Sequence, residues 1–260
     1  MLQIITISKN DFFEIKATEV KRNVDSNVIY LIKNVIDRDV IKFIREEIEE
    51  WTLNEEQRWV PLDENCVNFH RINDEYEKSY VKTKAHTFYY NLWLKESEPI
   101  KNYFLEIFDF KRQITNFANL DYLHNKPIDG FVSRVIVHHY PIGGGYMEEH
   151  TDPVNIYNPV QTIIQASEKG KDYISGGLFV RDPESNEEIF VDDDFRIGDM
   201  IVFNPHIPHG VKPIDENKET DWKVKKGRYL IIPLSLRSDL IKNNEESPKG
   251  ISYDNRNYYD

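Results

Sequence analysis

The sequence predicts a mainly β protein with flanking helices, and two observations indicate this fold class. From residue 131 to 236, short apolar runs alternate with Gly, Pro, Asn and Asp, which is typical of an all-β sandwich or barrel. Before residue 125, apolar residues also recur at helical spacing. The 260 residues suit one domain. We expect an N-terminal elaboration over 1–125, a β core over 126–237 and a polar tail over 238–260.

The N-terminal half contains expected elements of both kinds. Residues 4–7 and 28–32 are rich in β-branched side chains and predict two strands. Asp37 is a candidate N-cap for a helix that ends near Trp51, with isoleucines at helical spacing between them. Aliphatic and aromatic residues within 100–117 follow the i, i+3, i+4, i+7 rule. This second segment predicts a helix that covers one face of a sheet.

Five apolar runs in the later half predict the strands of the β core. They are FVSRVIVHHY (131–140), PVQTIIQAS (159–167), GGLFVRD (176–182), DMIVFN (199–204) and RYLIIPLSL (228–236). Residues 54–80, by contrast, are polar and irregular, and we expect a loop or lid there. The acidic run 192–194 has no calcium-loop spacing after it and predicts an exposed turn.

Composition narrows the class of function. The chain has 33 Lys and Arg against 45 Asp and Glu, a net charge of −12, which disfavours a basic nucleic-acid-binding domain. Its single cysteine, Cys66, excludes an intrachain disulfide and a cysteine-based metal cluster and fits a reducing compartment. No apolar run approaches the roughly 20 residues of a membrane span, and the first residues do not resemble a signal peptide. We therefore expect a cytoplasmic protein without a membrane partner.

His150 and Asp152 form the most distinctive polar pair in the sequence. Residues i and i+2 of a strand point to the same face, so both side chains can reach one point. His209, from a later segment, can complete a set of three ligands, with His206 as its rival. Two imidazoles and a carboxylate suit a divalent first-row metal and leave one side open. His-x-Asp alone is common, so the surrounding motifs carry the argument.

Those motifs follow a definite order. They are Tyr140-Pro141, the glycine-rich turn Gly143-Gly144-Gly145-Tyr146, His150-Thr151-Asp152, Gly176-Gly177, Gly198-Asp199, His209-Gly210-Val211 and Gly227-Arg228. The set resembles the iron(II)- and 2-oxoglutarate-dependent oxygenases, and the stretch from Tyr140 to Asp152 is most similar to their prolyl-hydroxylase branch. The resemblance covers roughly residues 131–236. It implies a double-stranded β-helix, a jelly-roll barrel with the metal at its mouth.

The resemblance also implies a role for each matched residue. His150, Asp152 and His209 would bind iron(II). Arg228 would hold the distal carboxylate of 2-oxoglutarate as a bidentate pair, which suits a planar guanidinium. Tyr140 would hydrogen-bond the same carboxylate. Oxygen would be the second co-substrate, with ascorbate as an optional reductant.

One departure from the family pattern concerns Arg228. It follows His209 by 228 − 209 = 19 positions, a longer interval than is common in the branch. The polar stretch 215–226 accounts for the excess as a surface insertion. Arg237 is the rival anchor. We favour Arg228 because Gly227-Arg228 begins the apolar strand.

The period of two in a strand extends the candidate site. His138 and Arg134 share the face of Tyr140, so His138 is a candidate for the co-substrate and Arg134 for the substrate. For His138, a hydrogen-bonded structural histidine is an equal alternative. Gln161 on the next strand could reach the co-substrate. Asn155, just past the metal pair, could face the substrate, although an asparagine there also suits a turn.

The function expected from the resemblance is hydroxylation of an unactivated C–H bond, with release of succinate and CO2. The substrate would be a small molecule, such as an amino acid or a natural-product intermediate. Alternatives are a protein side chain, a non-catalytic 2-oxoglutarate- or metal-binding module, and a zinc hydrolase. Asp152 disfavours halogenation, because halogenases of the superfamily have a small residue in its place. The oligomeric state stays open, with a homodimer as one option.

Overall fold

The structure is a computed structural model that describes residues 1–51, 62–75, 79, 81–115, 121–152, 157–223 and 225–240. Its helices are α1 (Lys9–Glu14), α2 (Ala17–Asp25), α3 (Arg38–Trp51), α4 (Glu98–Tyr103) and α5 (Leu105–Thr115). Its strands are β1 (Gln3–Ser8), β2 (Val28–Lys33), β3 (Phe69–Asp74), β4 (Thr83–Asn91), β5 (Phe131–Pro141), β6 (Gly145–His150), β7 (Gln161–Gln165), β8 (Gly177–Arg181), β9 (Glu188–Phe190), β10 (Met200–Phe203), β11 (His209–Ile214) and β12 (Gly227–Arg237). The chain is mainly β with flanking helices, as predicted.

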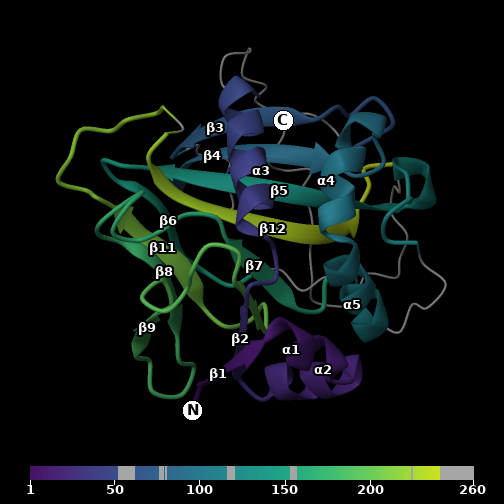
Figure 1. Cartoon of the computed structure of the whole chain (residues 1–260), viewed down its shortest axis with the longest axis horizontal. Coiled ribbons are helices and arrows are strands. Elements are labelled where there is room, and N and C mark those ends of the chain that lie inside the picture. The colour runs from purple at the N-terminus through teal and green to yellow at the C-terminus, as the bar shows by residue number, and fades with distance from the viewer. Residues whose placement is uncertain are drawn as a thin grey trace.

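The strands form two layers (Figure 1). Hydrogen-bonded neighbours follow the order β1-β2-β10-β7-β12-β5-β4-β6-β11-β8-β9, and β3 pairs with β4. At the centre, β5 and β12 pair over eleven residues each, from Gly227 opposite Pro141 to Arg237 opposite Phe131. Strands β6, β11, β8 and β9 make the smaller layer on the other side of the core. The five predicted strands of the later half correspond to β5, β7, β8, β10 and β12.

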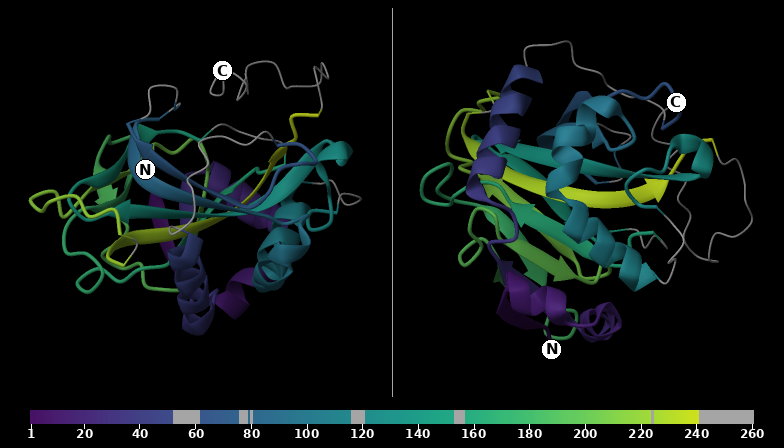
Figure 2. Two further views of the ribbon diagram at one scale, coloured as in Figure 1. Left: turned by 90° about the horizontal axis from the view of Figure 1, so that it is seen from above. Right: turned by 45° about the vertical axis from the view of Figure 1, so that its right-hand side comes forward.

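The two faces of the large layer carry separate cores, because strand side chains alternate between faces. Val135 and Val137 of β5 pack toward the helices, within one cluster that includes Ile44 of α3 and Phe108 of α5. Figure 2 shows these helices on one side of the sheet. Tyr140 points the other way, into a second cluster between the layers. We call this second side the inner face.

The N-terminal predictions are confirmed for the two strands and for α3, whose Ile41, Ile44 and Ile48 are buried. The helix expected within 100–117 is instead two helices, α4 and α5, that meet at Phe104. The apolar spacing continues through this break, so periodicity alone gives no sign of it. No helix of the described ranges is long and apolar enough to span a bilayer.

The sequence prediction for residues 54–80 is wrong for β3, which pairs antiparallel with β4. Arg71 and Asn73 obscure its strand pattern in the sequence, and β4 is not predicted either. The outcome matters for function, since these two strands widen the inner face beside β5. The stretch after β11 agrees better with expectation, because residues 216–220 are exposed, as a surface insertion requires. Most of the expected tail, residues 241–260, lies outside the described residues.

Candidate metal centre and co-substrate pocket

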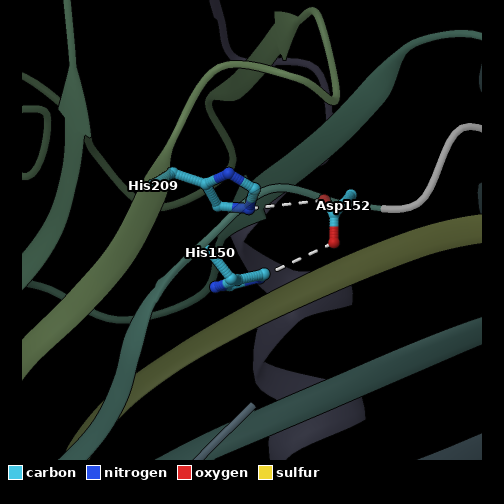
Figure 3. Close-up of side chains that lie close together, drawn as sticks. All are labelled: His150, Asp152 and His209. Atoms are coloured by element: carbon cyan, nitrogen blue, oxygen red, sulfur yellow. Dashed lines mark ion pairs between the residues drawn. The ribbon is translucent and has the colours of Figure 1, made fainter. Parts of the chain in front are cut away.

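His150, Asp152 and His209 lie together between the two layers. β6 ends at His150, and β11 begins at His209, which pairs directly opposite it. One potential ligand atom from each of the three side chains lies within 4.8 Å of the others. His209 Nε2 lies 3.3 Å from one oxygen of Asp152, and His150 Nε2 lies 3.6 Å from the other (Figure 3). His206, the rival ligand, is exposed and stands outside this group.

The hydrogen bonds of the two imidazoles fix the tautomer that a metal needs. His150 Nδ1 lies 2.9 Å from the Glu148 carbonyl, and His209 Nδ1 lies 2.9 Å from the Ile207 carbonyl. A carbonyl only accepts hydrogen bonds, so each Nδ1 carries the proton and each Nε2 directs its lone pair toward Asp152. Two nitrogen lone pairs and a carboxylate therefore converge. Acceptors that face one another in this way suit a cation between them.

The electrostatics of the group point the same way. Burial opposes the charged form of His209, but the Asp152 carboxylate raises the pKa of this imidazole overall. Burial alone would raise the pKa of Asp152, whereas the positive charge and the hydrogen bonds that the two histidines supply when they are also protonated at Nε2 lower it well below its ordinary value. The centre thus stabilises a positive charge, which a divalent metal supplies in place of a proton.

Gln161 supports the carboxylate ligand. Its side-chain Nε2 donates to Asp152 Oδ2, and its own Oε1 accepts from the backbone N–H of Thr162 at 3.0 Å. The sequence predicted that Gln161 would reach the co-substrate. Its amide hydrogen-bonds Asp152 and can orient that carboxylate, and a contact with the co-substrate stays a prediction.

Arg228 is buried on the inner face, opposite Tyr140. Its side chain is 0% exposed, and Nε and Nη2 donate to the two oxygens of Asp192 at 2.6 and 2.8 Å. Nη1 is buried without a hydrogen-bond partner among the described residues. The bidentate pair of Arg228 in the structure is with Asp192, whereas the predicted pair with 2-oxoglutarate stays a prediction, for which only the remaining donors of Arg228 are left.

Asp192 corrects a second prediction. The sequence indicated an exposed acidic turn, but the side chain of Asp192 is 0% exposed. Besides Arg228, it accepts from Tyr173 Oη at 2.6 Å and from the backbone N–H of Leu178 at 3.0 Å. A Cβ on Gly177, whose φ is +124°, would clash with this carboxylate, so the predicted glycine pair also makes room for it. Asp193, its neighbour, is exposed.

Tyr140 lies opposite Arg228 on this face, and its hydroxyl is only weakly engaged. Only 1% of the residue is exposed, and within the described residues its Oη makes one weak hydrogen bond, to Met147 Sδ at 3.8 Å. Burial raises the pKa of Tyr140 far above neutral pH, so the hydroxyl keeps its proton. Arg228 Nη1 and Tyr140 Oη together offer two donors in a closed space, which suits one carboxylate.

The other predicted residues lie at increasing distance from this pocket. His138 shares the inner face, and its Nδ1 lies 3.0 Å from Thr87 Oγ1. Burial lowers the pKa of His138 to about 3, so the ring is neutral. Arg134 lies further along β5, where its Nε donates to Asn91 at 2.6 Å. Arg237 is at the opposite end of β12, about 30 Å from Arg228 at strand spacing, and cannot share its pocket. Asn155 lies outside the described residues.

Comparisons with known proteins agree with this geometry at the level of fold. No protein-family model and no curated protein matches the chain. Among solved structures, the chain is similar to a Pseudomonas putida prolyl-4-hydroxylase, with 13% identity over 85% of this chain and 98% of that one and a TM-score of 0.53. The chain has the fold of the iron(II)- and 2-oxoglutarate-dependent oxygenases. The predicted double-stranded β-helix with flanking helices is thereby confirmed.

Two further structures share this oxygenase fold. One is a Trichoplax adhaerens prolyl hydroxylase in complex with a hypoxia inducible factor peptide fragment, with 16% identity, a TM-score of 0.53 and coverage of 89% of this chain and 93% of that one. The other is a Neurospora crassa protein in complex with alpha-KG and 5-formyluracil, with 14% identity, a TM-score of 0.52 and coverage of 91% and 85%. The ligands named in these complexes differ, so the fold does not define a substrate.

Proposed function

We propose that the protein is an iron(II)- and 2-oxoglutarate-dependent oxygenase that hydroxylates a small molecule. The observation that carries the proposal is the convergence of two Nε2 lone pairs and one carboxylate within 4.8 Å, with both Nδ1 protons held by backbone carbonyls. This donor set is the facial triad of non-haem iron enzymes and leaves coordination positions for other ligands. His150, Asp152 and His209 would hold the metal.

The co-substrate would occupy the pocket between the metal centre and Arg228. Its distal carboxylate would accept hydrogen bonds from Arg228 Nη1 and Tyr140 Oη, the two donors that lack strong partners among the described residues of this pocket. Asp192 would hold the guanidinium still, since it binds the other edge at 2.6 and 2.8 Å. Bound iron and 2-oxoglutarate would supply the oxidative chemistry, with succinate and CO2 as products and ascorbate as an optional reductant.

The chain's own residues would shape this chemistry in two ways. Gln161 would keep one oxygen of Asp152 engaged and so fix the orientation of the carboxylate ligand. Apolar side chains of the inner core, such as Leu230 and Ile163, would exclude water from the pocket. His138, neutral and held near Thr87, would complete the wall on the side of β4.

The enclosure of the inner face supports a small-molecule substrate. A peptide needs an open groove, whereas Tyr89 and Ile136, which lie on the inner face beyond His138, are each 9% exposed. Hydroxylation of a protein side chain is the second candidate. It is favoured by the likeness in fold to the Trichoplax adhaerens prolyl hydroxylase, which was solved with a peptide fragment.

An anaerobic titration with iron(II) and 2-oxoglutarate tests the proposal. We expect the visible charge-transfer band of the chelate in the wild type and its loss in His209→Ala and Asp152→Ala. The matched control is His206→Ala, which removes an exposed histidine three residues away and should leave the band unchanged. No band in folded wild-type protein that binds zinc tightly would overturn the proposal in favour of a hydrolase or binding module.

A further inference from the structure

Arg71 of β3 is a second arginine of the inner face, and the sequence reasoning missed it. It lies directly opposite Thr87 of β4, and Thr87 lies opposite His138 of β5. Directly opposed residues of an antiparallel sheet share a face. The Thr87 hydroxyl reaches His138 Nδ1 at 3.0 Å, which confirms the shared face. Arg71 is thus two strands, about 10 Å, from the backbone of His138.

The charge of Arg71 lacks a partner among the described residues. Its one hydrogen bond there runs from Nη2 to Tyr89 Oη at 2.9 Å, and Nε is buried and unpaired. No carboxylate of the described ranges pairs with Arg71, although the residue is only partly exposed. Arg228 and Arg45, by contrast, each pair with an aspartate. An anion would stabilise a partly buried guanidinium, and because the described residues give Arg71 none, an anionic ligand would fit it.

The surroundings of Arg71 define what the ligand looks like. The Arg71 guanidinium lies over the ring of Tyr89, 5.7 Å from its centroid, and Tyr89 stacks on Phe69 at 4.3 Å. Ile136 and then Ile232 continue the same row across the sheet. An apolar strip therefore runs from the cation toward the middle of the inner face. A ligand that fits has an anionic end and an apolar body.

A second unsatisfied donor borders the same strip. Trp93 packs against the cluster of Phe69, Tyr89 and Ile136, and its Nε1 is buried without a hydrogen-bond partner in the described part of the chain. Buried indole N–H groups normally have an acceptor. Together with Arg71 Nε, it makes two orphaned donors near one apolar surface.

We propose that Arg71 binds the carboxylate of a small anionic substrate, whose apolar body contacts the small exposed part of Tyr89 and Ile136 and extends toward the metal centre. The proposal rests on the proposed oxygenase function and names its substrate class. A free guanidinium fork can hold a carboxylate by two parallel hydrogen bonds. The assignment distinguishes two sites for anions. Arg228 of β12 lies opposite Tyr140 of β5, whereas Arg71 lies on β3.

Pairs of acids and primary amides test this assignment. The probes are 3-phenylpropionate, hexanoate and N-acetylphenylalanine with their amides, added to protein that holds manganese(II) and 2-oxoglutarate. Paramagnetic relaxation of the probe protons reports both affinity and proximity to the metal. The variants are Arg71→Gln and Arg71→Lys, and the control is Arg22→Gln, an exposed arginine of α2. Melting temperatures show that each variant is folded.

We expect at least one acid to bind the wild type about 10-fold to 100-fold more tightly than its amide. Arg71→Gln should abolish that preference, Arg71→Lys should keep part of it, and Arg22→Gln should leave it unchanged. The affinity for 2-oxoglutarate should change less than about 2-fold in Arg71→Gln. The proposal is overturned if no acid is preferred over its amide, or if the preference survives in Arg71→Gln.

Two other outcomes keep this proposal distinct from the proposed function. If Arg71→Gln loses 2-oxoglutarate as strongly as the probes, then Arg71 anchors the co-substrate and the assignment to substrate is wrong. If the wild type binds neither manganese(II) nor 2-oxoglutarate, the oxygenase function fails. Saturation-transfer measurements on the metal-free protein with the same probes then decide whether Arg71 still selects carboxylates.

Discussion

Arg228 and Arg71 lie on the same face of the large layer, yet their surroundings are opposite. Arg228 is 0% exposed and paired at both Nε and Nη2 with Asp192, so a single donor group lacks a partner among the described residues. Arg71 is partly exposed and makes one neutral hydrogen bond. A guanidinium that is locked by its own carboxylate presents one fixed point of contact. A guanidinium without one keeps donors for a ligand that supplies the missing charge.

Removing the Asp192 carboxylate should show the difference between the two arginines most strongly. Asp192→Asn leaves the buried Arg228 cation without its anion, and we expect the free energy of unfolding to fall by about 3–5 kcal/mol. Asp193→Asn is the matched control. Its exposed ion pair with Lys169 is worth about 1 kcal/mol or less. Denaturant unfolding measures both, and equal losses would contradict the account.

The buried histidines His70 and His86 extend the comparison with the two arginines. A histidine can lose its proton and become neutral on burial, whereas an arginine stays charged. Burial lowers the pKa of His70 to about 4, with a further contribution from His86, and burial lowers the pKa of His86 to about 4 as well. The unfolded chain, with histidine pKa values near about 6.5, binds more protons between roughly pH 4 and 6.5. Stability is therefore present above about pH 6.5 and lost as the pH falls through this window.

From pH 7 to 5.5, each of these two histidines should lower the free energy of unfolding by about 1 kcal/mol. His70→Phe suits the site, since His70 stacks on Phe88 at 4.6 Å, and it removes one titrating group. Its loss of stability over the same pH range should be smaller by that amount. Urea unfolding at both pH values measures the effect, and an unchanged pH dependence in the variant would contradict it.

A substitution of Tyr140 tests the surroundings of Arg228 without removing a charge. Tyr140→Phe deletes a hydroxyl whose single bond is weak, so the fold should be retained. The lost hydrogen bond to the co-substrate should weaken 2-oxoglutarate binding about 3-fold to 10-fold. Tyr30→Phe, which removes a hydroxyl that accepts from Asn23 outside the inner face, is the control and should have no effect. Isothermal titration with manganese(II) present measures both.

The smallest effect on stability is expected at Arg71. Arg71→Gln removes a partly desolvated cation that has no carboxylate partner in the described residues, so stability should stay within about 0.5 kcal/mol or rise. Thermal unfolding measures the change. A clear destabilisation, comparable to that of Asp192→Asn, would mean that Arg71 is a structural residue of the sheet and would contradict its assignment to a ligand.

The contrast also explains what could be predicted from the sequence. His150 and Asp152 are two positions apart in one extended segment, so strand periodicity brings them together, and the order of motifs adds His209 and Arg228. The burial of Asp192 has no local signal, because its partners Leu178, Tyr173 and Arg228 lie 14, 19 and 36 residues away in the sequence. Arg71 was missed for a similar reason. Its strand was itself unrecognised, and only the register with β4 and β5 brings it to the inner face.

The most direct test of the account compares the two arginine sites in one titration. The chelate band of iron(II) and 2-oxoglutarate is followed anaerobically in the wild type, Tyr140→Phe, Arg228→Gln and Arg71→Gln, each checked for folding. We predict that the affinity for 2-oxoglutarate falls in the Tyr140 variant and, by more than about 10-fold, in the Arg228 variant, and changes less than about 2-fold in the Arg71 variant. A loss of affinity for 2-oxoglutarate in Arg71→Gln alone would contradict the account, because Arg71 would then hold the co-substrate.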